Sequence, residues 1–295
     1  MTLPDHLILN FHIKFREEAK LQKHLYSSFR GAFGHALKQV SCLYLTGECR
    51  NCIQKKECDY NYIFETPVSE DTDFYQAGEY ASHPYVLVPP LADLNSFSIT
   101  LFGRGVSKWK TVVRAVQRMG PLGIGSSREK FRLCSVISSE TEIWNADTPG
   151  YFDIPAKSPY NLLEYGPEIK VSFFSPAQIR VNKKFIREPA FHDILRLIIR
   201  RLKSINYWHI DEAAQFEAAP YLEKAKPVKT LRSNTRWLTI PRYSNRQETK
   251  MKVKAMVGSM DYKGDFSRFS ELLAFAQVAH IGKKTAFGFG KILIE

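Results

Sequence analysis

The sequence lacks any apolar run of the roughly 18 residues that a membrane-spanning helix requires. Residues Met1 to Asp5 also lack the basic and apolar regions of a secretory signal peptide. Low-complexity stretches are missing as well, and 44% hydrophobic with 24% charged residues is the composition of an ordinary globular protein. These absences argue against a membrane, secreted or disordered protein. We therefore expect a folded cytoplasmic protein.

Acidic residues are outnumbered by basic ones. The chain contains 30 Asp and Glu residues against 42 Lys and Arg residues, which gives a formal net charge of +12. An excess of this size attracts a polyanion, so nucleic acid and an anionic membrane are the candidate partners.

Cysteines are scarce, and four of the five fall within one short segment. Cys42, Cys49, Cys52 and Cys58 are separated by six, two and five residues, which is unlike the disulfide framework of a secreted domain. Four soft ligands in a segment with little other means of holding a shape indicate a metal site. Tetrahedral zinc fits best, and an iron–sulfur cluster or unmetallated thiols are the alternatives.

The length of 295 residues and a repeated order of elements indicate two domains. Alternating apolar residues predict strands at 6–15 and 169–173, and helical spacing predicts a helix after each of them. The predicted elements of each half follow the order βα…ββαβ. This repeated order is typical of a tandem ferredoxin-like (RRM-like) α+β fold. We expect an N-terminal domain at 1–160, with the four-cysteine insertion at about 42–77, and a C-terminal domain at 161–295.

A glycine-rich stretch near the end of the chain carries two lysines. Gly282, Gly288 and Gly290 allow a ligand to approach the backbone closely, and Lys283 and Lys284 supply positive charge there. Phosphate is the ligand that these features favour, and a tight turn between a helix and a strand is the alternative interpretation. The stretch has neither the Walker pattern nor a Rossmann-type setting, which disfavours a nucleotide cofactor.

A strand with basic residues precedes this stretch. Lys250, Lys252 and Lys254 alternate with apolar residues, so one face of the strand presents three ammonium groups. Arg232 and Arg236 come shortly before it, beside aromatic side chains on which bases can stack. We expect RNA to bind here. A solvated edge strand is the alternative interpretation.

Several motifs distributed over nearly the whole chain carry a resemblance to a known family. They are Phe29-Arg30-Gly31-Ala32-Phe33-Gly34-His35, the cysteine block ending Cys58-Asp59-Tyr60 with Phe64-Glu65, Gly123-Ile124-Gly125 leading to Lys130-Phe131, Phe174-Ser175-Pro176, and His280-Ile281-Gly282-Lys283 with Phe287-Gly288-Phe289-Gly290. With these motifs the sequence resembles the CRISPR-associated endoribonuclease six family of the RAMP superfamily, which processes precursor CRISPR RNA in antiviral defence. The last motif looks like the C-terminal glycine-rich signature of that family.

The resemblance implies a tandem ferredoxin-like fold and CRISPR repeat RNA or crRNA as the partner. It also implies metal-independent cleavage in which the 2′-hydroxyl of the RNA is the nucleophile, leaving a 2′,3′-cyclic phosphate and a 5′-hydroxyl. Such a reaction needs a base, an acid and positive charge near the phosphate. Arg30, in the first motif, joins the residues expected to bind RNA.

The resemblance also suggests catalytic residues. A histidine near the end of the first helix is common in the family, and His35 occupies that region here. His24 lies earlier on the same helix and His280 adjoins the glycine-rich stretch, so both are further candidates. Tyr26 and Lys283 are candidates for supporting roles.

Two other functions remain open from the sequence. A related RAMP subunit that binds guide RNA within an effector complex, without nuclease activity, would use the same fold and the same glycine-rich stretch. A DNA-binding zinc protein is disfavoured, because the segment from Cys42 to Cys58 shows no helical periodicity suited to a DNA groove.

Overall fold

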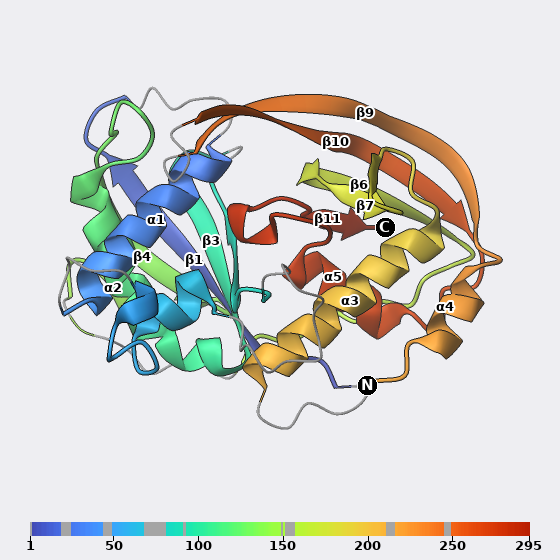
Figure 1. Ribbon diagram of the computed structural model, residues 1–295, viewed down its shortest axis with the longest axis horizontal. Coiled ribbons are helices and arrows are strands. Elements are labelled where there is room, and N and C mark those ends of the chain that lie inside the picture. Colours follow the sequence, from blue (N-terminus) through green and yellow to red (C-terminus); the bar gives the residue numbers. More distant parts are fainter. Residues whose placement is uncertain are drawn as a thin grey trace. The chain divides into compact units, whose positions relative to one another are not determined.

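The computed structural model describes residues 2–18, 25–43, 49–67, 81–90, 93–148, 150, 157–210, 216–244 and 249–295, without the side chains of residues 50, 242–244, 249 and 250. The chain divides into two compact units (Figure 1). The N-terminal unit comprises Pro4–Ser158 and Tyr207–Asp211, and the C-terminal unit comprises Met1–Leu3, Pro159–Asn206 and Glu212–Glu295. The division after Ser158 lies two residues from the boundary expected after residue 160.

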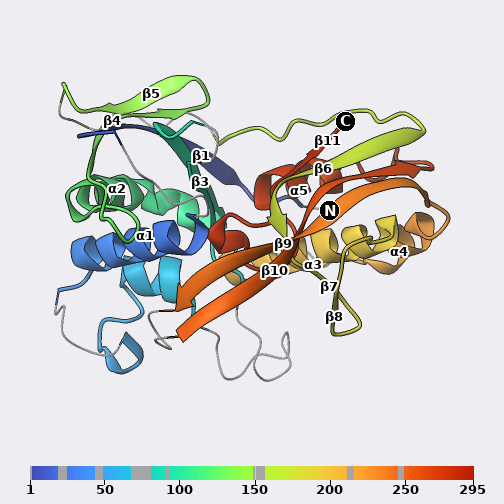
Figure 2. The ribbon, with the colours of Figure 1, turned by 90° about the horizontal axis from the view of Figure 1, so that it is seen from above.

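The N-terminal unit is a five-stranded antiparallel sheet with two helices. Its elements are β1 (His6–Phe15), α1 (Tyr26–Ser41), the short helices η1 (Cys49–Asn51) and η2 (Asn61–Glu65), β2 (Tyr85–Val88), β3 (Ser96–Phe102), η3 (Gly103–Lys108), α2 (Trp109–Leu122), β4 (Phe131–Ser138) and β5 (Thr141–Asn145). The strand order is β2-β3-β1-β4-β5. Helices α1 and α2 lie on the same face of this sheet (Figure 2).

The apolar periodicity of the sequence explains this packing. Leu7, Leu9 and Phe11 alternate on β1 and are fully buried, as are Phe29 and Phe33 on the inner side of α1. Burying each such side chain contributes about 1.5–3 kcal/mol. Among the described residues, no helix is long and apolar enough to cross a membrane.

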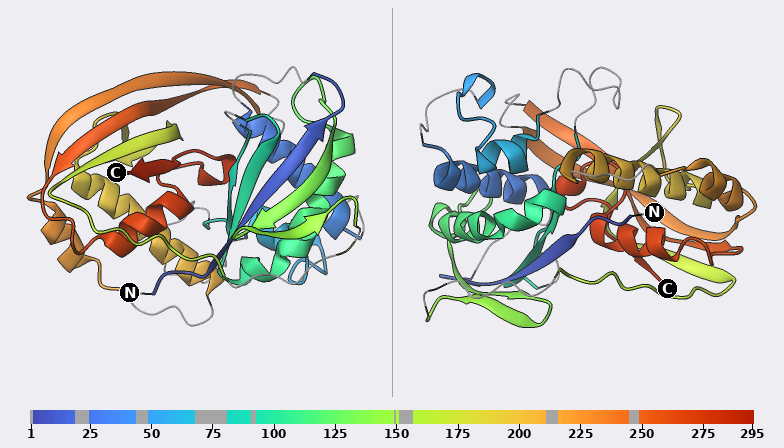
Figure 3. Two further views of the ribbon diagram at one scale, coloured as in Figure 1. Left: turned by 180° about the vertical axis from the view of Figure 1, so that it is seen from behind. Right: turned by 90° about the horizontal axis from the view of Figure 1, so that it is seen from below.

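The C-terminal unit contains the same core order, βαββαβ, among its elements. They are β6 (Glu168–Ala177), β7 (Ile179–Val181), β8 (Lys184–Ile186), α3 (Phe191–His209), α4 (Ala219–Ala225), β9 (Lys229–Ser244), β10 (Thr249–Lys263), α5 (Ser270–Ala279), η4 (Thr285–Phe287) and β11 (Ile292–Ile294). The main sheet has the order β11-β6-β10-β9, and β7 and β8 form a separate hairpin. Helices α3 and α5 lie on one side of the main sheet (Figure 3), where the Phe191 ring packs edge-on against Tyr262 and Phe266.

The cysteine-containing segment corrects one expectation. Residues 42–77 were expected to form an insertion outside the core, but η2 belongs to the N-terminal core. Ile63 is fully buried, and the Phe64 ring lies so close to Gly34 of α1 that a Cβ there would be 2.2 Å from it. The segment η2 has only five residues, which is too few for a periodic pattern that would have predicted this packing from the sequence.

Candidate functional site

The glycine-rich stretch forms a compact loop between α5 and β11 of the C-terminal unit. The Ile281 amide donates to the Gly290 carbonyl (2.9 Å), and the Gly290 amide donates to Pro176 of β6 (3.0 Å). Gly290 has φ +74°, and a Cβ there would lie 1.9 Å from the Ile281 carbonyl oxygen; Gly282 has φ +83° and a similar conflict, at 2.6 Å, with Gln178. Two of the glycines are thus required for backbone packing, as the tight-turn interpretation expected. Gly288, with φ +91°, ends η4.

His280 is enclosed beneath this loop. Its ring is 2% exposed, and Nδ1 lies 3.1 Å from the Phe289 carbonyl oxygen, to which it donates as the Nδ1–H tautomer. Burial, reinforced by the charge of Lys291, lowers the pKa of His280 to about 3. A neutral, enclosed imidazole holds the loop but does not reach a phosphate on the surface, so the geometry does not favour His280 as a catalytic residue.

The basic strand presents its lysines as the alternation predicted. On β10, Lys252 and Lys254 are exposed while Val253 and Ala255 are buried. The Lys254 ammonium lies 4.3 Å from the centroid of the Trp237 ring on the neighbouring strand β9. The side chain of Lys250 lies outside the described residues.

Gln178 joins this strand to the loop. Its side-chain Nε2 donates to the Lys254 carbonyl of β10 (2.7 Å), while its own carbonyl accepts the Lys283 amide (3.0 Å). Lys252, Lys254, Lys283 and Lys284 therefore belong to one region of the C-terminal unit, which we call the basic surface. Sequence reasoning missed Gln178, because a single glutamine at a strand end carries no signal.

The two predicted arginines of β9 lie farther along the hairpin. Both are exposed. Arg232 is in register with Asp261 of β10 and Arg236 with Val257, whereas the lysines Lys252 and Lys254 pair with residues nearer the hairpin tip. The arginines thus extend a line of positive charge along β9 rather than joining the loop.

His35 stands on the exposed side of α1 in the N-terminal unit. Its Nε2 lies 3.0 Å from Nε2 of Gln39, and Oε1 of Gln39 accepts a hydrogen bond from Nε of Arg118 on α2 (2.6 Å). Lys38 lies one turn along, 5.8 Å over the Tyr60 ring. An exposed imidazole among cationic groups is suited to proton transfer at an anionic substrate.

The remaining predicted residues of α1 differ from His35 in their surroundings. Tyr26 is buried, and burial raises its pKa to about 12, so its hydroxyl does not reach an exposed substrate. Arg30 stacks 3.9 Å over the Phe64 ring and lies 3.4 Å from Nε2 of His83, which fixes η2 on α1. His24 lies outside the described residues.

The four clustered cysteines are free and half-buried. Burial raises the pKa of the Cys49 thiol; the charge of Lys38 opposes this rise, and Glu65, Cys42 and Cys58 add to it. In the described parts of the chain, however, no group of three or more Cys, His, Asp or Glu side chains is arranged to hold a metal ion. Zinc at these cysteines, with Cys52 as a fourth ligand, stays a prediction.

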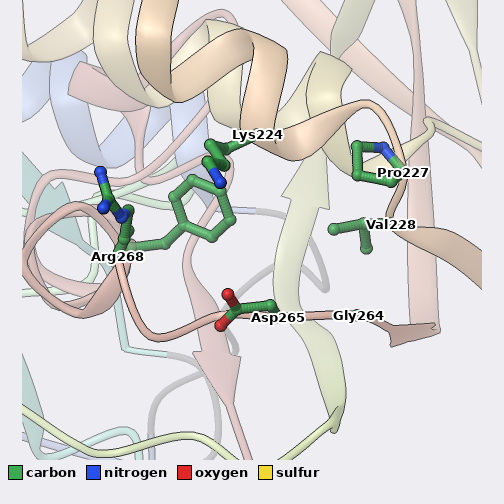
Figure 4. Close-up of a pocket in the computed structure, with 7 residues that line it drawn as sticks. Lys224, Pro227, Val228, Gly264, Asp265 and Arg268 are labelled. Atoms are coloured by element: carbon green, nitrogen blue, oxygen red, sulfur yellow. The ribbon is translucent and has the colours of Figure 1, made fainter.

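Two adjoining cavities of about 270 and 280 Å³ lie in the C-terminal unit and share Lys224, Arg268 and Phe269. Figure 4 shows the first of them. The Asp265 carboxyl also lines the first of them. Hydrogen bonds from Ser267 lower the pKa of Asp265, and Lys224 and Arg268 lower it further. The carboxylate therefore balances part of the cationic charge, and the cavities include no residue predicted from the sequence.

Two family models match the sequence, one in each half of the chain. Residues 171–292 match the model of the CRISPR-associated endoribonuclease Cas6 family, and residues 4–155 match the AF_1859_N model, described as an N-terminal domain. No curated protein gives a significant match to the sequence.

Solved structures show where the fold recurs. Thermus thermophilus Cas6 (TTHB231) superposes with a TM-score of 0.60 at 12% identity, and a Cas6 (TTHB231) product complex with 0.58 at 15% identity; each alignment covers 100% of both chains. A Cas6 (TTHA0078) product complex gives 0.53 at 17% identity, again over 100% of both chains. The match over residues 171–292 supports an assignment to the CRISPR-associated endoribonuclease Cas6 family, and the solved structures share the fold along the whole chain.

Proposed function

We propose that this chain is a precursor-CRISPR-RNA endoribonuclease that cuts repeat RNA without a metal ion, leaving a 2′,3′-cyclic phosphate and a 5′-hydroxyl. The observation that carries the proposal is the exposed imidazole of His35 on α1, which lies one helical turn from Lys38 and is linked through Gln39 to Arg118. The structures of Cas6 (TTHB231) and Cas6 (TTHA0078) described as product complexes support an enzymatic role.

The chemistry follows from these groups. His35 removes the proton of the 2′-hydroxyl, the 2′-oxygen attacks the adjacent phosphorus, and the 5′-oxygen leaves and takes up a proton. Cationic side chains stabilise the extra negative charge of the phosphorane. Because the nucleophile is supplied by the RNA, no metal-activated water is required.

RNA binding is assigned to basic side chains within each unit. In the C-terminal unit, Lys252, Lys254 and Lys283 present ammonium groups to the phosphate backbone, and Trp237 offers a ring beside them. The element order βαββαβ and the strand orders of the two sheets support a tandem ferredoxin-like fold.

We also propose that the cysteine segment holds a structural zinc ion that the chemical step does not need. The spacing of Cys42, Cys49, Cys52 and Cys58 within one short segment supports this proposal. Elemental analysis should find about one zinc per chain, as expected for one four-thiolate site. A protein free of zinc, or the brown absorbance of an iron–sulfur cluster, would reject the zinc assignment.

Cleavage in the presence of EDTA tests the proposed activity. The full-length protein should cut labelled repeat RNA at an unchanged rate in EDTA, and the 5′ product should carry a cyclic phosphate. Cleavage that stops in EDTA contradicts the mechanism. Tight binding without any cleavage would replace it with the role of a guide-RNA-binding RAMP subunit in an effector complex.

A further inference from the structure

The Gln39 side chain lies between those of His35 and Arg118 in the N-terminal unit. A guanidinium can only donate hydrogen bonds, whereas an imidazole nitrogen can donate or accept one. Nε of Arg118 on α2 donates to Oε1 of Gln39 at 2.6 Å. On the other side, Nε2 of Gln39 lies 3.0 Å from Nε2 of His35. All three side chains belong to the packed pair of helices α1 and α2.

The contact with Arg118 fixes the orientation of the Gln39 amide. A guanidinium has donors only, so the atom of Gln39 that faces it must be the carbonyl oxygen. The amide NH2 group, which also has donors only, then faces His35. Nε2 of His35 must therefore be the acceptor, and the ring proton of the neutral imidazole is on Nδ1.

A proton on Nε2 of His35 does not fit this arrangement. The Nε2–H would point at the N–H groups of Gln39, and turning the amide would place those groups against Arg118. Neither helix supplies a counter-charge, because the charged residues of α1 and α2 are all basic. They are Arg30, Lys38, Lys110, Arg114 and Arg118.

Two acidic groups of the segment 49–67, Asp59 and Glu65, are engaged elsewhere. Asp59 accepts from Thr111 (2.6 Å) and pairs with Lys108 (2.8 Å), and Glu65 accepts from the Tyr60 hydroxyl (2.8 Å). The Gln39 amide is therefore the polar group that the structure places against Nε2 of His35.

We propose that Arg118 and Gln39 are positioning residues that hold the ring proton of His35 on Nδ1, so that Nε2 serves as the base of the cleavage reaction. The inference rests on the proposed function. The 2′-hydroxyl displaces the Gln39 amide from Nε2 and transfers its proton there as the 2′-oxygen attacks phosphorus. The bond to the 5′-oxygen breaks, and that oxygen takes a proton from water. The imidazolium, opposed by Gln39, then returns its proton to solvent.

The tautomer is measurable without RNA. Two-bond ¹H–¹⁵N NMR of labelled full-length protein at about pH 8, above the ordinary histidine pKa, should show mainly the Nδ1–H form for the ring that disappears in His35→Ala. Gln39→Leu removes the donor and should shift that ring toward the Nε2–H form that prevails in water. Arg118→Met, which frees the amide to turn, should do the same, whereas Arg118→Lys keeps a donor to Oε1 and should restore the wild-type pattern.

Cleavage measured on the same variants separates the two proposals. Gln39→Leu should slow single-turnover cleavage while leaving RNA affinity unchanged, because Gln39 acts through His35. A wild-type ring in the Nε2–H form, or a Gln39→Leu spectrum identical to wild type, overturns the positioning inference and leaves the nuclease proposal standing. If wild type shows the Nδ1–H form but His35→Ala remains fully active, the catalytic role of His35 is contradicted instead.

Discussion

His35 and His280 are the same residue type in opposite surroundings. His35 is exposed on α1 of the N-terminal unit, among basic side chains. His280 is enclosed below the glycine loop of the C-terminal unit, and burial lowers its pKa to about 3. The sequence places His280 beside the most distinctive motif, yet the motif buries it. Exposure therefore separates a histidine suited to chemistry from one that holds a loop.

The largest expected effect concerns the exposed histidine, His35. His35→Ala should slow RNA cleavage by about 10²–10⁴-fold with nearly unchanged affinity, because a general base contributes to the transition state rather than to binding. Single-turnover cleavage and RNA titration on the same preparation measure both quantities. His12→Ala, which removes another exposed histidine of the same unit, is the matched control and should remain fully active. Equal reductions in the two variants would contradict a specific role for His35.

The next effect concerns the folding of the glycine loop. Gly290→Ala should lower the free energy of unfolding by roughly 2–4 kcal/mol, because its Cβ would meet the Ile281 carbonyl oxygen at 1.9 Å and its φ is +74°. Urea unfolding measures the change. Gly166→Ala has nothing within 4 Å of its added Cβ and should change stability little. If Gly290→Ala is as stable as Gly166→Ala, the loop does not require its glycine for packing.

Measuring stability at a series of pH values tests the burial of His280. Because the pKa of His280 is about 3 in the native state against an ordinary 6.5, the unfolded chain binds more protons between these values, and stability falls as the pH drops through that window. From pH 7 to pH 5 His280 alone should account for a decrease of about 2 kcal/mol. His6, whose pKa burial lowers to about 4, contributes in the same direction.

The difference between two proteins isolates the contribution of His280. Urea unfolding of wild type and of His280→Asn at both pH values should show the smaller pH dependence in the variant, since Asn does not titrate and His6 is present in both. Identical pH dependence would mean that His280 is accessible to protons in the native state.

The smallest effect concerns the basic surface. Replacing Lys252 and Lys254 by Ala should reduce the salt dependence of RNA binding by about 1.4 log units per log unit of salt, because each phosphate that a lysine neutralises on single-stranded RNA accounts for about 0.7. Lys229→Ala with Lys263→Ala removes the same charge from the opposite end of the same hairpin, where these two residues are in register. Equal slopes in the two double variants would show that only net charge matters.

The parts of the fold with clear periodicity were predictable from the sequence. Alternating residues on β1, β6 and β10 located the strands, and the helical stripes located α1 and α3. The packing of η2 on Gly34, the hairpin of β7 and β8, and the role of Gln178 were not predictable, because each depends on how side chains and backbone pack in three dimensions. The burial of His280 belongs to the same class.

The glycine motif illustrates the same limit at the candidate site. The glycines indicated a backbone with unusual conformations. From the sequence, close approach of a phosphate and a tight turn remained alternative explanations for them. The close approach of Gly282 to Gln178 and of Gly290 to Ile281 accounts for these glycines by packing. Positive charge at the loop therefore comes from its lysine side chains, of which Lys283 is exposed.

The most direct test of the central claim is a single 2′-deoxy substitution at the nucleotide preceding the cut. In EDTA, wild-type protein should bind the substituted repeat RNA as tightly as the unmodified one and should fail to cut it, while the unmodified RNA yields a cyclic phosphate end. Cleavage of the deoxy-substituted RNA at the same position would contradict attack by the 2′-hydroxyl and, with it, the role assigned to His35.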